Sequence, residues 1–268
     1  MEKLIVLGTG TASVTENFNT CFILESNDGK YLLVDTGGGS GILKQFKLAN
    51  ISLNSIHDIF VSHKHIDHLF GLLWIYRFVD ISMKKGTYEG NLNIYCHDEL
   101  AGIIRYMITN LLRKSQQQFL DKRIFINVVK NHEVVKVLDY DLEFIDILSK
   151  SDKQFGFKTS LHNGKTLAFL GDEPLDETLF DEVRNYDYLL HESFCLDEEM
   201  SNNRSKGNTH DTVKTASIKA QNLGVKNLVL WHTQENLGKY RQERYLTEAK
   251  KYFSGTVYVP NDFDIITL

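Results

Sequence analysis

The residues most able to do chemistry stand together in the segment His63-Lys64-His65-Ile66-Asp67-His68. Residues two apart on an extended chain point to the same side, so His63 and His65 can bind one ion together. Asp67 and His68 follow where the chain turns into a helix, and they can reach a second position. Imidazole and carboxylate ligands at this density suit zinc, and they also accept manganese or iron. The segment therefore predicts a site for one or two metal ions.

Regular elements surround this segment. Residues 57–61 form an apolar strand that runs directly into it, and residues 69–79 have the pattern of a helix. Earlier in the chain we expect strands at residues 3–7, 20–26 and 30–35. Asn27-Asp28-Gly29-Lys30 joins the last two, because Asp-Gly supplies the positive φ angles of a tight hairpin.

The remainder of the chain alternates between strands and helices. Further strands are expected at residues 91–96, 142–148, 154–160, 166–171, 187–190, 225–231, 256–259 and 263–267. Helices are expected after Gly37-Gly38-Gly39, at 98–112, and from Thr209, as N-cap, to Leu223 before Gly224. This order indicates two sheets flanked by helices. Only two prolines and no Gly/Ser-rich tract occur, so we expect one domain spanning residues 1–268.

Composition narrows the class of protein. The net charge of −5 argues against a broad nucleic-acid-binding surface. The three cysteines, Cys21, Cys96 and Cys195, are widely spaced and odd in number, which fits a reducing compartment better than a disulfide framework. We find no apolar segment long enough to span a membrane and no signal peptide. A cytoplasmic protein with no membrane partner is therefore expected.

The histidine-rich segment resembles the His-x-His-x-Asp-His signature of the metallo-β-lactamase-fold hydrolases. Three other segments resemble that family's remaining motifs and occur in the family's order. One precedes the histidine-rich segment, Leu33-Val34-Asp35-Thr36-Gly37, and two follow it, Leu170-Gly171-Asp172 and Leu228-Val229-Leu230-Trp231-His232. In the family, the aspartate that matches Asp35 supports the metal site from behind, and the one that matches Asp172 bridges the two ions. The residue that matches His232 is the last histidine ligand. The resemblance implies an α/β fold, a four-layer αββα sandwich of two mixed sheets, with the metals at one edge.

Each of these later motifs also has an ordinary structural interpretation. Asp35 could begin a turn, the Gly171-Asp172 pair could cap a helix, and His232 could be a partly exposed histidine at a strand end. Their order relative to the histidine-rich segment is what favours the metal interpretation. On the resemblance, Asp172 and His232 complete the second metal position.

A closer resemblance is to the ribonuclease Z-like branch of this family. Leu7-Gly8-Thr9-Gly10-Thr11, followed by Asn19-Thr20, is similar to its opening. Leu190-His191-Glu192-Ser193-Phe194 resembles its His-Glu-Ala-Thr motif, and Thr209-His210-Asp211-Thr212 resembles the next one. In that branch the residues matching Glu192 and His210 assist departure of the alcohol leaving group.

Physical chemistry is consistent with a role for His210 as general acid. A helix N-terminus disfavours positive charge, so His210 there tends to lose its proton. A carboxylate from Glu192 opposes this effect and keeps a protonated imidazole available. The alternative is that His210 merely caps its helix.

Two departures from the family pattern matter. The family's third histidine for the first ion precedes a Gly-aromatic pair, here Gly156-Phe157, but residues 146–153 contain no histidine. Leu148 or Lys150 occupies the expected position, and the first site is expected to be weak, completed by water, or helped by a carboxylate such as Asp152. The second departure is that about twenty residues separate Ser151 from Asp172, too few for the tRNA-binding arm of true ribonuclease Z enzymes. Action on tRNA is therefore not expected.

These observations predict a metal-dependent hydrolase, a phosphodiesterase for a small molecule or nucleotide. A bound metal lowers the pKa of water from about 15.7 towards about 7. Asp67 would orient or deprotonate that water, and His210 with Glu192 would protonate the leaving oxygen. Two alternatives stay open: an ester, lactone or thioester hydrolase using the same site, and a metal-binding homologue with little catalysis. The oligomeric state stays open, with a homodimer as the commonest outcome for such domains.

Overall fold

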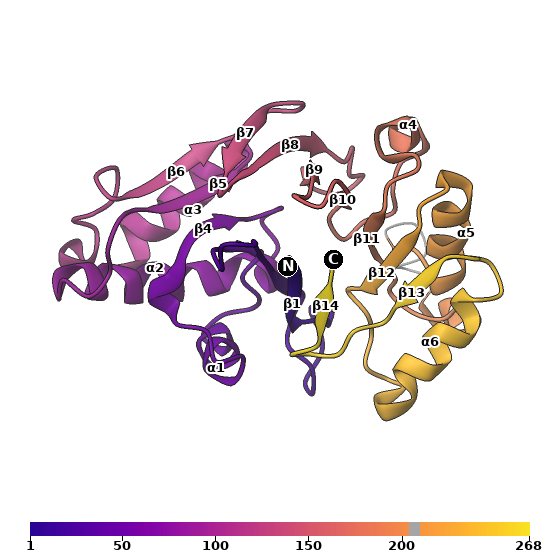
Figure 1. Cartoon of the computed structure of the whole chain (residues 1–268). Helices are drawn as coiled ribbons and strands as arrows, with labels where there is room; N and C mark the ends of the chain where they lie inside the picture. The colour runs from indigo at the N-terminus through magenta and orange to yellow at the C-terminus, as the bar shows by residue number, and fades with distance from the viewer. Residues whose placement is uncertain (204–209) are drawn as a thin grey trace.

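The computed structural model describes residues 1–203 and 210–268 and arranges the described strands in two seven-stranded sheets (Figure 1). The first sheet has the order β14-β1-β2-β3-β4-β5-β6 and the second the order β13-β12-β11-β10-β9-β8-β7. The strands of the first sheet are β1 Lys3–Gly8, β2 Cys21–Glu25, β3 Tyr31–Val34, β4 Ile56–Phe60, β5 Leu92–Cys96, β6 Ile124–Val128 and β14 Ile265–Thr267. Those of the second are β7 Val134–Val137, β8 Tyr140–Asp146, β9 Phe155–Ser160, β10 Thr166–Phe169, β11 Tyr188–Glu192, β12 Asn227–Trp231 and β13 Thr256–Tyr258.

Helices cover the outer face of each sheet (Figure 1). The helices against the first sheet are α1 Gly41–Leu48, α2 Ile66–Lys84 and α3 Asp98–Leu111, and those against the second are α4 Phe180–Val183, α5 Val213–Leu223 and α6 Arg241–Ala249. Both sheets are mixed: β1, β2 and β3 pair antiparallel, whereas β3 to β6 and β10 to β13 pair parallel. The expected αββα sandwich of two mixed sheets is confirmed.

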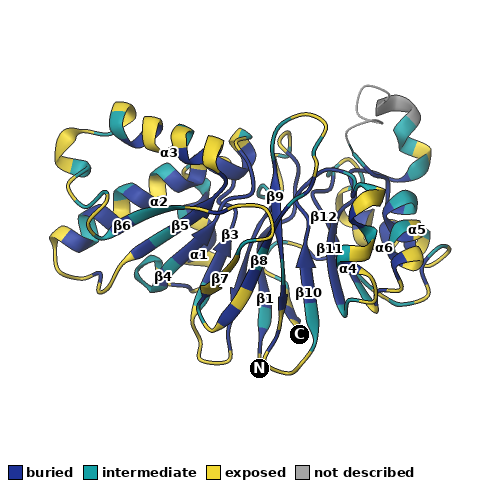
Figure 2. Ribbon diagram, turned by 90° about the horizontal axis from the view of Figure 1, so that it is seen from above, coloured by how far each residue is buried: buried dark blue, intermediate teal, exposed yellow. Residues whose placement is uncertain are grey.

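Strand β12 illustrates why these sequences form central strands. Its last four residues, Leu228 to Trp231, are fully buried. Val229 and Trp231 pack in the core between the two sheets, whereas Leu228 and Leu230 pack under the outer helices. A strand that is covered on both faces must be apolar at successive positions, which is the pattern of parallel sheets. Figure 2 shows the same contrast between buried strands and helices with one exposed face.

Several elements differ from the sequence-based expectation. Strands β6 and β7 were not expected, because both are short edge strands with few buried side chains. Helix α6 was not expected either. Helix α5 begins after Thr212, whose hydroxyl accepts a hydrogen bond from the Thr215 amide at 3.1 Å. The expected N-cap, Thr209, lies outside the described residues. Gly224 ends α5 as expected, with a φ of +68°. None of the described helices combines the length and the apolar character needed to cross a membrane.

Helix α2 packs very closely against the turn that follows β3. The amide and the hydroxyl of Thr36 both donate to the carbonyl of His68, at 2.8 and 2.7 Å, and the Gly71 amide donates to the Gly37 carbonyl at 2.8 Å. A Cβ atom added at Gly71 would lie 1.9 Å from the Thr36 carbonyl oxygen. Only glycine therefore lets the helix approach this turn.

We expect Gly71→Ala to lower the free energy of unfolding by about 1–3 kcal/mol, because the methyl group forces the helix away from backbone atoms. Gly102 in α3 is a matched control, since a Cβ atom there would meet nothing within 4 Å. Gly102→Ala should raise the free energy of unfolding by up to about 1 kcal/mol through helix propensity. Urea denaturation measures both, and equal stabilities of Gly71→Ala and the wild type would contradict the close approach.

Candidate metal centre

The predicted site residues follow the carboxyl ends of strands from both sheets. His63 to His68 follow β4, Asp172 follows β10, and His232 follows β12 directly. Asp35 follows β3, which pairs parallel with β4. Asp35 and His232 have φ angles of +57° and +53°, which are uncommon for residues other than glycine and cluster at functional sites. The sheets therefore deliver these side chains to one edge of the sandwich.

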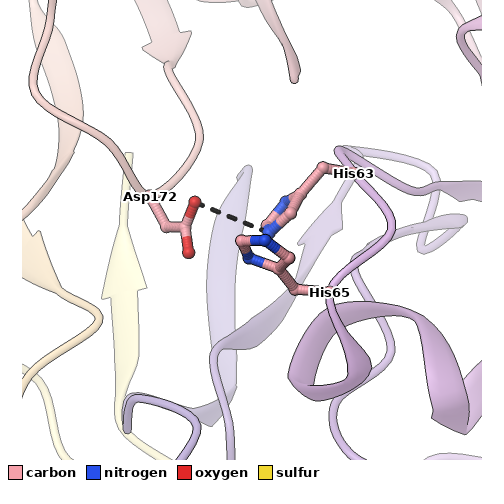
Figure 3. A group of neighbouring side chains, drawn as sticks. All are labelled: His63, His65 and Asp172. Carbon is pink, nitrogen blue, oxygen red and sulfur yellow. Dashed lines mark ion pairs between the residues drawn. The ribbon is translucent and has the colours of Figure 1, made fainter. Parts of the chain in front are cut away.

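The side chains form two groups of potential metal ligands. His63, His65 and Asp172 make the first group, shown in Figure 3, where both imidazoles lie on one side of the carboxylate. Asp67, His68 and His232 make the second group. Within each group the ligand atoms lie within 4.8 Å of one another. The structure thus brings together all six residues predicted to bind metal.

Asp172 faces both groups at once. Its Oδ1 lies 3.6 Å from Nε2 of His63, and its Oδ2 lies 3.3 Å from Nε2 of His68 and from Nε2 of His232. The second group is closed by Asp67, whose Oδ2 lies 3.4 Å from Nε2 of His68. One oxygen of Asp172 is therefore directed to each group, which is the arrangement a bridging carboxylate requires.

The polar atoms at this centre test whether a metal ion fits. Nε2 of His63, Nε2 of His68, both ring nitrogens of His232 and Oδ1 of Asp172 are buried and have no hydrogen-bond partner among the described residues. Buried polar atoms are almost always hydrogen-bonded, since an unsatisfied one costs about 1–3 kcal/mol. Lone pairs of this kind converging on one point are what a cation such as zinc would satisfy. The residues present fit a metal.

Asp35 lies behind the centre and sets the orientation of two histidines. It is 1% exposed, and its Oδ2 lies 2.7 Å from Nδ1 of His68. The Ser62 hydroxyl donates to Asp35 at 2.8 Å and lies 2.9 Å from Nδ1 of His63. Because that hydroxyl uses its hydrogen on Asp35, its oxygen accepts from Nδ1 of His63. Both imidazoles therefore carry their hydrogen on Nδ1 and turn Nε2 towards the centre.

The electrostatics of the centre favour a cation. Burial by itself raises the pKa of Asp172, but the surrounding histidines, His63 foremost, hold it well below the ordinary value. Burial by itself lowers the pKa of His68, but the carboxylates of Asp35 and Asp172 raise it well above the ordinary value. Without a metal, protonated imidazole thus compensates the buried carboxylates. A divalent cation supplies the same compensation and releases the proton.

His210 and Glu192 lie beside the second group. Nδ1 of His210 is 3.4 Å from Oε2 of Glu192 and 3.1 Å from the Asp172 carbonyl oxygen, and its ring stacks on Phe194 at 4.8 Å. Burial raises the pKa of Glu192 well above its ordinary value, and the nearby Asp211 carboxylate acts in the same direction. The structure places both residues next to His232, with which they form a third group of potential ligands. Their catalytic roles stay predictions.

Two contacts at this centre were not foreseen. The sequence pattern did not indicate Ser62 as the link between Asp35 and His63, although its place immediately before the first histidine is a signal that could have been used. Asp152 was considered only as a ligand, whereas its Oδ2 lies 3.1 Å from Nε2 of His65.

The chain is similar in sequence to proteins of known families. The sequence profile of the family described as anti-Pycsar protein Apyc1 matches residues 2–245 of the chain. The chain is 24% identical over 295 residues to a ribonuclease Z of Nitrosopumilus maritimus, covering 95% of this chain and 96% of that protein. It is 26% identical over 310 residues to a ribonuclease Z of Thermococcus onnurineus, covering 100% of this chain and 95% of that protein.

Solved structures show the same fold. The metallo-β-lactamase-fold protein YhfI from Bacillus subtilis has a TM-score of 0.78 at 19% identity, covering 99% of this chain and 98% of its own. A diphosphatase of the PhnP family has a TM-score of 0.72 at 16% identity, with 99% of this chain and 96% of its own covered. The similarity therefore extends over essentially the whole of both chains.

We expect Asp35→Asn to weaken binding of both metal ions by about 10–100-fold, because it disturbs the outer hydrogen bonds of His63 and His68. Ser62→Ala should weaken only the ion held by His63, since the bond from His68 to Asp35 is kept. Zinc titration against a chromophoric chelator measures the two affinities. Unchanged affinities in Asp35→Asn would show that this carboxylate does not orient the ligands.

Proposed function

This chain belongs to the anti-Pycsar protein Apyc1 family and has the metallo-β-lactamase fold, and from this premise we propose its function. We propose that it is a metal-dependent phosphodiesterase for a small molecule or nucleotide. The observation that carries the proposal is the buried centre of imidazole and carboxylate groups around Asp172, with the His210–Glu192 pair beside it. The first part provides for metal binding and the second for protonation of a leaving group.

The side chains divide the work of hydrolysis between them. His63, His65 and Asp172 would hold one ion, and Asp67, His68, His232 and Asp172 the other. Bound zinc, manganese or iron lowers the pKa of water and neutralises charge on phosphoryl oxygens. Burial by itself raises the pKa of Asp67, but the nearby imidazoles of His232 and His68 hold it far below its ordinary value. Asp67 is therefore a carboxylate able to orient the attacking water.

His210 would deliver the proton to the leaving oxygen. Both oxygens that Nδ1 contacts, the Asp172 carbonyl and Oε2 of Glu192, can accept a hydrogen bond. Nδ1 therefore carries a hydrogen, and Nε2 is the nitrogen that exchanges a proton with the substrate. Glu192 is held in turn by the Asp211 amide, which donates to its Oε1. This arrangement keeps the histidine in one orientation.

The connection between β9 and β10 favours a small substrate. Residues 161–165 join these two antiparallel strands as a tight turn, and Asp172 follows shortly after β10. The chain thus has no room here for an RNA-binding arm. The alignment with the Thermococcus onnurineus ribonuclease Z is longer than this chain, so that relative has residues without a counterpart here. With the net charge of −5, this supports a small molecule or nucleotide over tRNA.

Two other functions make different use of the same centre. An ester, lactone or thioester hydrolase would need the same metal ligands. It would not need a general acid that protonates the alcohol leaving group of a phosphate ester. A metal-binding homologue with little catalysis would also have the ligands, and the absence of a histidine from residues 146–153 is its best support. The stacked and hydrogen-bonded position of His210 favours the phosphodiesterase over both.

We expect the zinc- or manganese-loaded protein to hydrolyse bis(p-nitrophenyl) phosphate and Asp67→Ala to lose at least about 100-fold of kcat, because the water is no longer oriented. Asp181→Ala is a matched control, since that aspartate has a side chain 91% exposed and pairs only with Arg184 among the contacts described. Full activity of Asp67→Ala would refute the mechanism. Metal content without turnover of phosphodiesters, esters or lactones would favour the binding protein.

His210→Ala should separate the phosphodiesterase from the ester hydrolase. Loss of a general acid costs about 10²–10⁴-fold when the leaving group is a poor one, and far less when it is p-nitrophenolate. We therefore expect a much larger loss of kcat/KM for a nucleotide diester with an alcohol leaving group than for bis(p-nitrophenyl) phosphate. If the two losses are equal and small while an ester or lactone is the better substrate, the site is an ester hydrolase.

A further inference from the structure

The segment that lacks the family's third histidine, residues 146–153, has a defined place in the structure. Leu148 has a φ of +57° and a side chain that is 50% exposed, and Lys150 is exposed as well. Both line a surface cavity of about 270 Å³ together with Pro174 and Glu177. Leu148 offers no ligand atom, and the Lys150 side chain is exposed and lines this cavity. Neither takes the place of the histidine.

Two anchors hold this segment against the metal centre. The carboxylate of Glu173, the residue after the bridging Asp172, accepts hydrogen bonds from the Lys150 amide at 2.9 Å and from the Ser151 hydroxyl. Immediately after the segment, the Phe155 amide donates to the Ser62 carbonyl at 3.0 Å. The segment is thereby fixed between the two parts of the chain that supply the first group of ligands.

These anchors present Asp152 to the loop of metal ligands. Its Oδ2 lies 3.1 Å from Nε2 of His65, and its Oδ1 lies 2.6 Å from Nζ of Lys64. An ionised carboxylate can only accept hydrogen bonds, so Nε2 of His65 carries the hydrogen. The lone pair of His65 is then on Nδ1. His65 is therefore directed in the opposite sense to His63, whose Nδ1 is bonded to Ser62 and whose Nε2 is the unpaired atom.

We propose that Asp152 is the positioning residue of the first metal site: it holds His65 through Nε2 so that Nδ1 binds the ion. This inference rests on the proposed metal-dependent function. The first site then has three protein ligands, His63, His65 and Asp172, where the family pattern has a third histidine as well. Catalytic zinc sites commonly combine three protein ligands with an open position. In this proposal Asp152 supports the ligand His65 by a hydrogen bond, and no third histidine is added to the site.

The contacts of Asp152 favour this role over direct ligation. Both of its oxygens are already engaged, one with the cationic Lys64 and one with His65. An ammonium group 2.6 Å from the carboxylate repels a divalent cation at the same place. Among the histidines proposed as metal ligands, His63 and His68 are supported in the same way, by Ser62 and by Asp35. Asp152 completes this set.

The test compares Asp152→Ala and Asp152→Asn, with Lys64→Ala as the matched control. Zinc affinities are measured for each ion by competition with a chelator, and nitrogen-15 NMR of the zinc-loaded protein reports which ring nitrogen of His65 is metallated. Asp152→Ala should weaken the first ion by about 10–100-fold and leave the second unchanged. Asp152→Asn, whose amide oxygen still accepts from Nε2, and Lys64→Ala should stay within a few-fold of the wild type. The wild type should show Nδ1 metallated.

Three outcomes would overturn the inference. If the Asp152 carboxylate is itself a metal ligand, Asp152→Asn will lose as much zinc affinity as Asp152→Ala. Metallation of Nε2 of His65, or unchanged zinc affinity of Asp152→Ala, would also contradict it. A wild type that binds two ions and hydrolyses phosphodiesters while Asp152→Ala behaves identically removes this inference alone. A wild type that binds no metal removes the proposed function with it.

Discussion

The structure depends on one buried carboxylate, that of Asp35. Its side chain accepts hydrogen bonds from the Ser62 amide and hydroxyl and contacts Nδ1 of His68, and only 1% of its surface is exposed. A buried charge is tolerable only when it is paired and hydrogen-bonded. These bonds therefore tie the end of β3 to the loop after β4 and to the start of α2. The close approach at Gly71, which lets Thr36 bond the His68 carbonyl, serves the same junction. The fold and the ligand orientation are thus one constraint.

Beside this junction lie several buried polar groups that have no hydrogen-bond partner among the described residues. Asp172 reaches imidazoles of both ligand groups. An apoprotein with this arrangement carries an electrostatic cost, which a bound cation removes. The neighbouring His210–Glu192 pair, which is the proposed proton donor, lies on the side of His232. This combination, in a chain of the Apyc1 family, is the basis of the proposed phosphodiesterase.

The local parts of this site could be predicted from the sequence, and the long-range parts could not. The loop after β4, Asp172 and His232 all stand at strand ends in recognisable short motifs, so their order along the chain was informative. The bond between Asp152 and His65 joins residues 87 positions apart, and no local pattern signals it. Strands β6 and β7 were missed because edge strands bury few side chains and lack a clear alternation. The N-cap of α5 at Thr212 depends on reciprocal hydrogen bonds with Thr215, which the sequence pattern did not single out.

The central claim is that Asp172 lies between two metal positions, each completed by the histidines of one group. Anomalous diffraction from crystals of the zinc-loaded protein, recorded on both sides of the zinc absorption edge, tests this claim most directly. The account predicts one zinc peak among His63, His65 and Asp172 and a second among Asp67, His68, His232 and Asp172. Absence of zinc from both positions, with the buried imidazole nitrogens bonded to protein atoms instead, would contradict it.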